Sequence, residues 1–263
     1  MVTNKSITGS EIIIKVLAEH EVDTIFGYSG GAILPTYDAI FQYNEKNKMN
    51  AMPLIVPANE QGAGFMASGY SRATGKPGIV MVTSGPGATN TVTPVRDAMA
   101  DSIPMLVICG QVGRSSIGTD AFQEAPITSV MGSVAKHVFL VTDEEKLEAT
   151  MRAAFEIATS GRPGPVVIDI PKDIQTANII PDASKRLNIS PYRERLSNVE
   201  NNSLNENECN SFFNLLKNSK RPLIYAGGGV IAGDACEELR EFSNKFQLPV
   251  VTTLMGIGAC DTK

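Results

Sequence analysis

Residues 79–90 read "IVMVTSGPGATN", an apolar run followed by a turn of Ser, Gly and Pro and then by a segment that can form a helix. The run at 79–82 is too short for a buried helix, so it predicts a strand. A turn that leaves a strand and opens a helix presents backbone N–H groups to a polar ligand. The same glycines also suit a tight structural turn that needs positive φ, and the turn alone does not decide between the two readings.

The same alternation of strand and helix recurs through the first two thirds of the chain. Apolar runs predict strands at 22–26, 54–56, 79–82, 105–109 and 166–170. Helices are predicted from a capping box at Thr8 and Glu11 to about His20, and at 33–43, 60–74 (closed by Gly75), 90–100 and 145–159. This order indicates an α/β fold, a parallel sheet flanked by helices, with ligands at the carboxyl ends of the strands.

Composition divides the chain into two domains and a linker. We expect a first domain over 1–175, a linker rich in Asn, Glu and Ser over 176–208, and the start of a second, Rossmann-like α/β domain over 209–263. One or two strand–helix units bury too little surface to stand alone, so the second domain is expected to be incomplete. Its turn "YAGGGVIA" (225–232) fits G-x-G-x-x-A, but Gln247 stands where a dinucleotide site needs an acid. Close packing of helix on strand is the simpler reading of those glycines.

The overall composition excludes several classes of protein. The 263 residues carry a net charge of −5 and no cluster of Lys and Arg, which argues against nucleic-acid binding. Four widely spaced cysteines and two histidines do not form a zinc or disulfide pattern, and no metal site is expected in this chain. No signal peptide or 18-residue apolar run is visible, so we expect a cytoplasmic protein without a membrane partner.

Glu60 is the most informative single residue of the chain. It lies in "ANEQGAGFMASGY" (58–70), and no charged residue follows it until Arg72. A carboxylate in the first turn of a helix is favoured by the helix dipole, so a capping role is the simplest reading. Yet the sequence Gly62-Ala63-Gly64 leaves room for a flat group, at up to about 1 kcal/mol of helix stability per glycine. This pattern predicts a planar nitrogen heterocycle held against the carboxylate.

Six motifs, in order, resemble those of the catalytic subunits of the acetolactate synthase (acetohydroxyacid synthase) family, which are thiamine-diphosphate transferases of isoleucine and valine biosynthesis. The motifs are "IFGYSGGAILPTYDAI", "NEQGAGFMASGYSRATGKPG", "VTSGPGATNTVTP", "IGTDAFQE", "FEIATSGRPGPVVIDIPKD" and "PVVTTLMGIGA". They span nearly the whole chain. The resemblance implies that pyruvate is decarboxylated and joined to a second 2-ketoacid, pyruvate or 2-ketobutyrate, giving acetolactate or acetohydroxybutyrate.

The resemblance also implies roles for individual residues. In that family a glutamate exchanges a proton with ring nitrogen N1′ of the aminopyrimidine of thiamine diphosphate, and Glu60 occupies its position. The catalytic positions implied beside Glu60 are Gly31 at the active-site mouth (with Gly30 and Ala32), Gln123 facing the reacting centre and Lys172 bordering the substrate channel. The implied cofactor contacts are Pro86 and Asn90 beside the pyrimidine, and Arg162, Gly227, Gly228, Gly229, Thr253 and Leu254 at a structural, redox-inactive FAD.

Some features depart from the family pattern. Ser29 and Gly113 stand where the family usually has Pro, and Asn59 where it usually has His, which bears on substrate preference. No "GDG" with a downstream Asn, the motif that holds Mg²⁺ and the diphosphate in the family's third domain, is present. We therefore expect the amino-terminal part of a longer enzyme, inactive alone, whose intact form is a homodimer or tetramer; a regulatory small subunit is a further partner in that family.

Two other functions stay open on the sequence. One is another FAD-associated thiamine-diphosphate enzyme, such as pyruvate oxidase or sulfoacetaldehyde acetyltransferase. Glyoxylate carboligase fits less well, because it lacks the glutamate. The other is a non-catalytic module that binds a partner chain.

Overall fold

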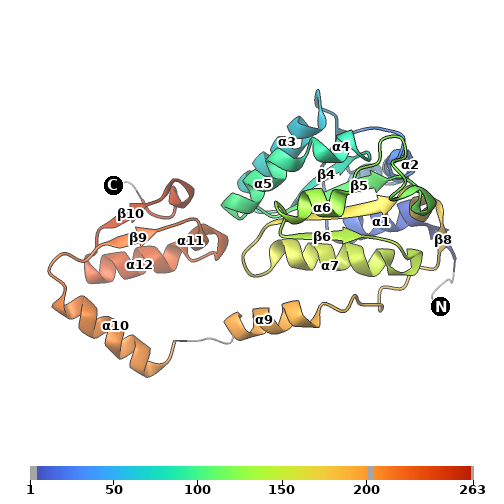
Figure 1. Cartoon of the computed structure of the whole chain (residues 1–263). Helices are drawn as coiled ribbons and strands as arrows, with labels where there is room; N and C mark the ends of the chain where they lie inside the picture. The colour runs from blue at the N-terminus through green and yellow to red at the C-terminus, as the bar shows by residue number, and fades with distance from the viewer. Residues whose placement is uncertain (1–4, 201–203, 262–263) are drawn as a thin grey trace. The chain divides into compact units, whose positions relative to one another are not determined.

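The computed structural model describes residues 5–200 and 204–261 and divides into two compact units, Met1–Arg193 and Glu194–Lys263 (Figure 1). The first unit is built on a six-stranded sheet in the order β3-β2-β4-β5-β7-β6, in which every neighbouring pair is parallel. Its strands are β2 (Ile25–Tyr28), β3 (Leu54–Ile55), β4 (Gly78–Val82), β5 (Met105–Gln111), β6 (His137–Leu140) and β7 (Pro165–Pro171). The expected parallel α/β sheet is confirmed.

Helices cover both faces of this sheet. On one face α1 (Gly9–Glu19) packs against α2 (Leu34–Lys46), α7 (Leu147–Thr159) and α8 (Lys172–Thr176). On the other face α3 (Glu60–Thr74) packs against α5 (Val92–Asp101), and Figure 1 shows these two helices across the sheet from α7. Isoleucine, leucine and valine from β4, β5 and β7 fill the core under α1 and α7.

The helix ends follow the signals in the sequence. Thr8 and Glu11 form the expected capping box at the start of α1. Helix α3 runs over the predicted 60–74, and Gly75 ends it in the left-handed region at φ 74°. Both helix ends are confirmed. They could be predicted because side-chain caps and glycine act on the backbone next to them and need no tertiary contact.

Several short elements were not expected. They are β1 (Ile7–Thr8), β6, β8 (Asn178–Ile179), α4 (Pro86–Thr89), α6 (Ile127–Gly132), α8, α9 (Ser190–Glu200) and the 3₁₀ turns Lys48–Asn50, Arg114–Ser116, Glu144–Lys146 and Leu254–Gly256. Most are too short for periodicity to reveal. The segment 176–208, expected as a linker, contains β8, which pairs antiparallel with β1, and α9. Its Ile179 and Ile189 are buried in the main core. The domain boundaries themselves stay a prediction.

Among its described residues, the second unit has two parallel strands and three α-helices that lie wholly within it; the end of α9 also belongs to it. Its elements are α10 (Glu206–Asn218), β9 (Ile224–Ala226), α11 (Gly229–Ala232), α12 (Cys236–Phe246) and β10 (Val250–Thr252). Phe212 and Phe213 of α10 contact Phe242 and Phe246 of α12. The order helix, strand, glycine turn, helix and strand from α10 to β10 is the order expected from the sequence of this segment.

Candidate active site at the carboxyl edge of the sheet

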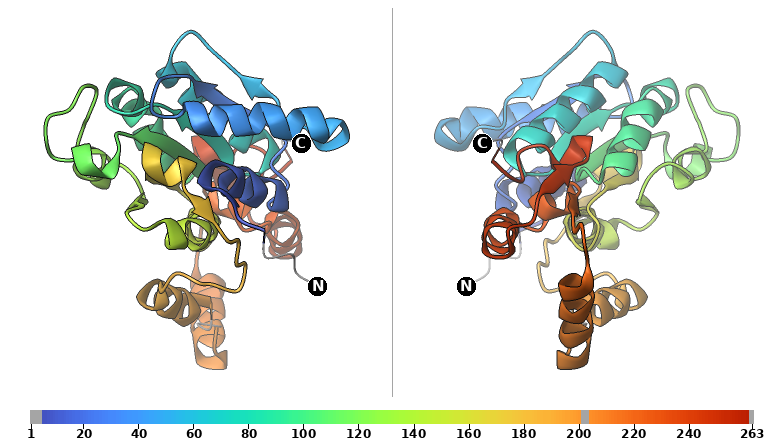
Figure 2. Two further views of the ribbon diagram at one scale, coloured as in Figure 1. Left: turned by 90° about the vertical axis from the view of Figure 1, so that its right-hand side faces the viewer. Right: turned by 90° about the vertical axis from the view of Figure 1, so that its left-hand side faces the viewer.

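The residues singled out in the first part of the sequence gather where the strands end. Figure 1 shows β5 and β7 pointing the same way, and the left view of Figure 2 looks onto the edge at which they end. Segments 29–32, 83–90 and 112–125 follow β2, β4 and β5, and Lys172 follows β7. Parallel strands therefore bring together loops that are up to about 140 residues apart in the chain.

Glu60 is a buried carboxylate at the first position of α3, with 9% of its surface exposed. Its Oε2 accepts a hydrogen bond of 2.8 Å from Nδ2 of Asn90, so the structure joins two residues expected at the pyrimidine. Tyr37 lies nearby, and burial followed by the negative charge of Glu60 raises the pKa of its hydroxyl. That hydroxyl donates to the carbonyl of Met81 at 3.0 Å rather than to the carboxylate. Among the described residues, Asn90 is the one side-chain donor to Glu60.

The capping role considered for Glu60 belongs to its neighbour. Asn59 is the N-cap of α3, and its Oδ1 accepts from the backbone N–H of Gly62 at 2.8 Å. Asparagine is among the best N-cap residues, so it satisfies the helix end without help from Glu60. The departure from the family pattern at Asn59 thus has a local structural reason, and Glu60 is left without a capping duty.

Gly87 is the backbone neighbour of the Glu60 carboxylate, and a side chain at this position would crowd both Glu60 and Thr83. A Cβ atom at this position would lie 3.4 Å from Oε1 of Glu60 and 2.7 Å from Cγ2 of Thr83. Pro86, at the start of α4, is exposed next to it. A carboxylate held by an amide at Oε2, with no side-chain donor at Oε1 among the described residues, can exchange a proton with a ring nitrogen, so these residues fit an aminopyrimidine.

The expectation that Gly64 leaves room for a ligand is wrong. Gly64 is buried, and a Cβ at this position would lie 2.3 Å from Cγ of Pro94. Ala63 is also fully buried. The small residues of α3 admit helix α5 at close range, which the sequence pattern could not distinguish from room for a flat ring.

Gln123 lies beside the turn after β4. Gly85 has φ 51°, and a Cβ there would come within 2.3 Å of the backbone oxygen of Gln123. Gln123 itself is exposed and also has positive φ, 58°. Glycine at 85 thus both adopts the turn and lets the loop that carries Gln123 approach it.

We expect Gly85→Ala to lower the free energy of unfolding by about 1–3 kcal/mol, because it combines a left-handed φ with a steric clash. Limited proteolysis should also cut the loop around Gln123 faster. Gly69→Ala is the matched control: Gly69 is an exposed glycine of α3 whose Cβ would meet nothing within 4 Å. This control should be neutral or stabilising by up to about 1 kcal/mol. Equal effects of the two changes would contradict the proposed close approach.

The turn at 30–32 is tied to the same region. The backbone N–H of Ala32 donates to Oγ1 of Thr83 at 3.2 Å, and a Cβ at Gly30 would lie 2.5 Å from the Thr83 side chain. Gly31 is exposed, with nothing within 4 Å of an added Cβ. Lys172 is exposed at the start of α8. Thr83, which the sequence reading did not single out, therefore organises two of the site's turns.

The residues expected at FAD lie in both units, with Arg162 in the first. Nε of Arg162 donates to Ser102 Oγ at 2.7 Å, and its Nη2 donates to the carbonyls of Met99 and Ala100 at 3.2 and 2.9 Å. This cation thus sits at the carboxyl end of α5, where the helix dipole favours it.

In the second unit, the glycine turn 227–229 lies beside the segment that follows β10. The N–H of Thr253 donates to Ala226 at 2.9 Å, and a Cβ at Gly228 would lie 2.9 Å from that of Met255. Leu254 is largely exposed. Gly228 is therefore needed for close packing, whereas a Cβ at Gly227 would lie 3.8 Å from Thr253 and one at Gly229 would meet nothing within 4 Å. The glycine turn lies where the parallel strands β9 and β10 end.

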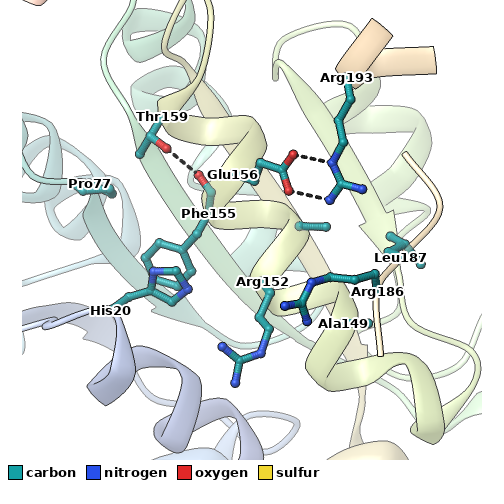
Figure 3. A pocket seen from close by; sticks show the side chains of 11 residues that line it. His20, Pro77, Ala149, Arg152, Phe155, Glu156, Thr159, Arg186, Leu187 and Arg193 are labelled. Atoms are coloured by element: carbon teal, nitrogen blue, oxygen red, sulfur yellow. Dashed lines mark hydrogen bonds and ion pairs between the residues drawn. The ribbon is translucent and has the colours of Figure 1, made fainter. Parts of the chain in front are cut away.

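A cavity of about 400 Å³ lies away from Glu60, between α7 and the segment that includes Leu187 and Arg193 (Figure 3). Its arginines already have partners in the chain. Arg193 pairs with both oxygens of Glu156 at 2.7 Å, and Arg152 pairs with Glu19 and Glu148. Arg186, the third arginine, donates to the backbone carbonyls of Ala183 and Lys185. Because all three arginines are already engaged within the chain, this cavity is a poorer candidate than the carboxyl edge of the sheet.

Neither a metal site nor a membrane span is found in the described part of the chain. No group of three or more His, Cys, Asp or Glu side chains there could hold a metal ion. Within the same residues, no helix is long and apolar enough to cross a membrane.

Comparison with known proteins matches both parts of the chain to one family. The model of the N-terminal TPP binding domain of thiamine pyrophosphate enzymes matches residues 7–131, and the model of their central domain matches residues 209–263. The chain is 46% identical over 258 residues to the mitochondrial acetolactate synthase catalytic subunit of Saccharomyces cerevisiae, covering 97% of this chain and 36% of that protein.

Other relatives give the same picture. The chain is 45% identical to the mitochondrial acetolactate synthase of Schizosaccharomyces pombe and 44% identical to the acetolactate synthase of Mycobacterium bovis. Each alignment covers 97% of this chain, and the two cover 38% and 39% of the relative, respectively. The chain thus spans less than two fifths of the length of these relatives. With a parallel α/β sheet, a buried glutamate at its carboxyl edge and matches to two domains of one family, the chain belongs to the thiamine pyrophosphate enzymes.

Proposed function

We propose that this chain contributes the pyrimidine-binding domain and part of the central domain of an acetolactate synthase catalytic subunit. The observation that carries the proposal is the buried Glu60 carboxylate, held by Asn90 and bordered by Gly87 rather than by a side chain. Relatives at 42–46% identity over at least 95% of the chain are named acetolactate synthases, which supports this member of the family.

Each residue of the site has a proposed task. Thiamine diphosphate, when bound, supplies the group that stabilises the carbanion left by loss of CO₂ from a 2-ketoacid. Glu60 would hold or release a proton at Oε1 toward a ring nitrogen of the cofactor, and the hydrogen bond from Asn90 to Oε2 fixes the orientation of the carboxylate. Pro86 and Gln123 border the site, Gly31 leaves its mouth open, and Lys172 offers a cation to substrate carboxylates.

FAD and Mg²⁺ complete the proposal as cofactors. The glycine turn 227–229, with Thr253 and Leu254, would hold part of FAD at the ends of β9 and β10, and Arg162 would contact the same cofactor. Mg²⁺ and the diphosphate would be held by protein outside the described residues, which contain no cluster of metal-binding side chains. The substrates of the whole protein would be pyruvate and 2-ketobutyrate. Its protein partners would be a second catalytic subunit and a regulatory subunit, and it would act in the cytoplasm.

Arg162→Ala in the whole protein should weaken FAD retention by about tenfold or more and leave thiamine-diphosphate affinity nearly unchanged, because a charge-assisted contact to the flavin is lost. FAD is followed by absorbance and thiamine diphosphate by the concentration that restores activity. Ser102→Gly is the control, because it removes a hydroxyl that binds Arg162 but keeps the cation, so FAD should be retained. Glycine suits this position because Ser102 has φ 62°. Equal loss of both cofactors would contradict the assignment of Arg162 to FAD.

The product formed from pyruvate separates this proposal from its rivals. With thiamine diphosphate, Mg²⁺ and FAD, the whole protein should release CO₂ and accumulate acetolactate. Acetyl phosphate formed in the presence of oxygen and phosphate would indicate a pyruvate oxidase instead. No turnover of any 2-ketoacid would favour a binding module.

A further inference from the structure

A buried acid in the central part of β7 has no role in the site described so far. Asp169 is 1% exposed and stands between Ile168 and Ile170 in an otherwise apolar strand. Its Oδ1 has no hydrogen-bond partner among the described residues. Its Oδ2 accepts from Nε2 of Gln111 at 3.0 Å. A buried acid with a single side-chain donor is less favourable for folding than an apolar residue. A role for Asp169 is therefore to be sought in its contact with Gln111.

The side-chain amide of Gln111 spans the base of a long loop. Gln111 is the last residue of β5, and its Oε1 accepts from the N–H of Val112 at 2.9 Å, where the loop begins. Its Nε2 also donates to the carbonyl of Ala125 at 3.2 Å, where the loop returns. One side chain thus fastens both ends of residues 112–125, here called the Gln123 loop.

Within the Gln123 loop, order depends on a second carboxylate. Glu124 accepts hydrogen bonds from the backbone N–H groups of Gly118, Thr119 and Ala121. Three loop residues, Gly118, Asp120 and Gln123, have positive φ. Non-glycine residues hold such conformations only when their surroundings enforce them. Phe122, beside Gln123, is 89% exposed and does not anchor the loop. The contacts that do are the Gln111 amide at the base and Arg114, which pairs with Asp173 and Glu144 near the start of the loop. The Gln111 amide is the one of these that reaches the end that carries Gln123.

We propose that Gln111 and Asp169 are positioning residues that hold the Gln123 loop against the turn at Gly85. Oδ2 of Asp169 is an acceptor at a fixed place in the sheet, and it selects the orientation of the Gln111 amide in which NH₂ faces both Asp169 and Ala125. In that orientation the amide oxygen of Gln111 accepts a hydrogen bond from the backbone N–H of Val112. If the Gln111 amide were flipped, its oxygen would face the oxygen atoms of Asp169 and Ala125, and neither hydrogen bond could form. The catalytic meaning of this pair rests on the proposed function, because it depends on Gln123 facing the reacting centre.

Hydrogen exchange of the 263-residue chain tests this pair without cofactor or substrate. Asp169→Leu removes the acceptor and keeps the site apolar, and we expect the amides of 118–124 to exchange about tenfold faster. Amides of β5 and β7 at 106–108 and 166–168 should stay as protected as in the wild type. Asp169→Asn keeps an oxygen toward Gln111 and should restore the slow exchange of the loop.

A second variant guards against failure of Asp169→Leu to fold. Gln111→Met keeps the length of the side chain and removes all three hydrogen bonds, so it should loosen the same amides. Unchanged loop exchange in the folded variants, or equal loss of protection in the loop and both strands, would overturn the proposal. If the loop loosens in these variants but the whole wild-type protein makes no acetolactate, the positioning pair stands and the proposed function is refuted. If the whole protein makes acetolactate but the loop does not loosen, only the positioning pair is refuted.

Discussion

Glu60→Gln in the whole protein should lower turnover of pyruvate by about 10²–10⁴-fold, the range typical for loss of a proton-transfer group. The amide is nearly isosteric with the carboxylate, and its oxygen can still accept from Asn90. We therefore expect the fold and its thermal stability to be retained. The measurement is steady-state acetolactate formation at saturating thiamine diphosphate and Mg²⁺, with unfolding followed in parallel.

A matched control separates catalysis from the helix dipole. Glu206 is the first residue of α10, as Glu60 is of α3, but it is exposed. Both glutamates interact with a helix N-terminus, so Glu206→Gln should remove a comparable dipole contact of about 0.3–1 kcal/mol and leave turnover unchanged. Wild-type turnover in Glu60→Gln would show that the carboxylate only stabilises α3.

The second large effect concerns the pH dependence of stability. Burial raises the pKa of Asp169 from its ordinary value of 3.8 to about 7, against a smaller opposing effect of the Gln111 hydrogen bond. Its stabilising contribution is therefore complete below about pH 3.8, declines as the pH rises through 7, and is absent above that. Wild type should lose on the order of 4 kcal/mol relative to Asp169→Asn between pH 4 and pH 8.

Urea unfolding of the 263-residue chain at several pH values measures this difference. Around Asp169, β5 presents the thiol of Cys109, which interacts with it electrostatically, and β6 presents Leu140 in register. Asp23→Asn is the control of opposite sign, since Lys76 and Tyr70 lower the pKa of Asp23 and its contribution is lost as the pH falls. Parallel pH profiles of wild type and Asp169→Asn would show that Asp169 is ionised throughout this range.

Strand–helix alternation and local caps made most of the first unit predictable. Buried runs such as 79–82 and 105–109 were strands because they are short and apolar, and Gly75 ended α3 because it can adopt positive φ. Glu60 was found by its isolation among small residues. These signals are local, so no tertiary information was needed to read them.

The sequence could not reveal contacts that arise only in three dimensions. Asn90 reaches Glu60 from 30 residues away, and Gly85 meets Gln123 across two loops. A glycine at position 64 is compatible with a ligand ring beside α3 and with the close contact to Pro94 that the structure has, and the sequence cannot distinguish the two. A single acid in the apolar run "VVIDI" was the one available hint of Asp169, and nothing local linked it to Gln111.

The rate at which the whole protein exchanges the C2 hydrogen of bound thiamine diphosphate for deuterium is the most direct test of the account. This rate reports proton transfer initiated at the pyrimidine, before any substrate or product step. Acid quenching and proton NMR would compare wild type, Glu60→Gln and Glu206→Gln at equal cofactor occupancy. We expect fast exchange in wild type and Glu206→Gln and a loss of about 10²-fold or more in Glu60→Gln. Exchange as fast in Glu60→Gln as in wild type would contradict a role for Glu60 in proton transfer.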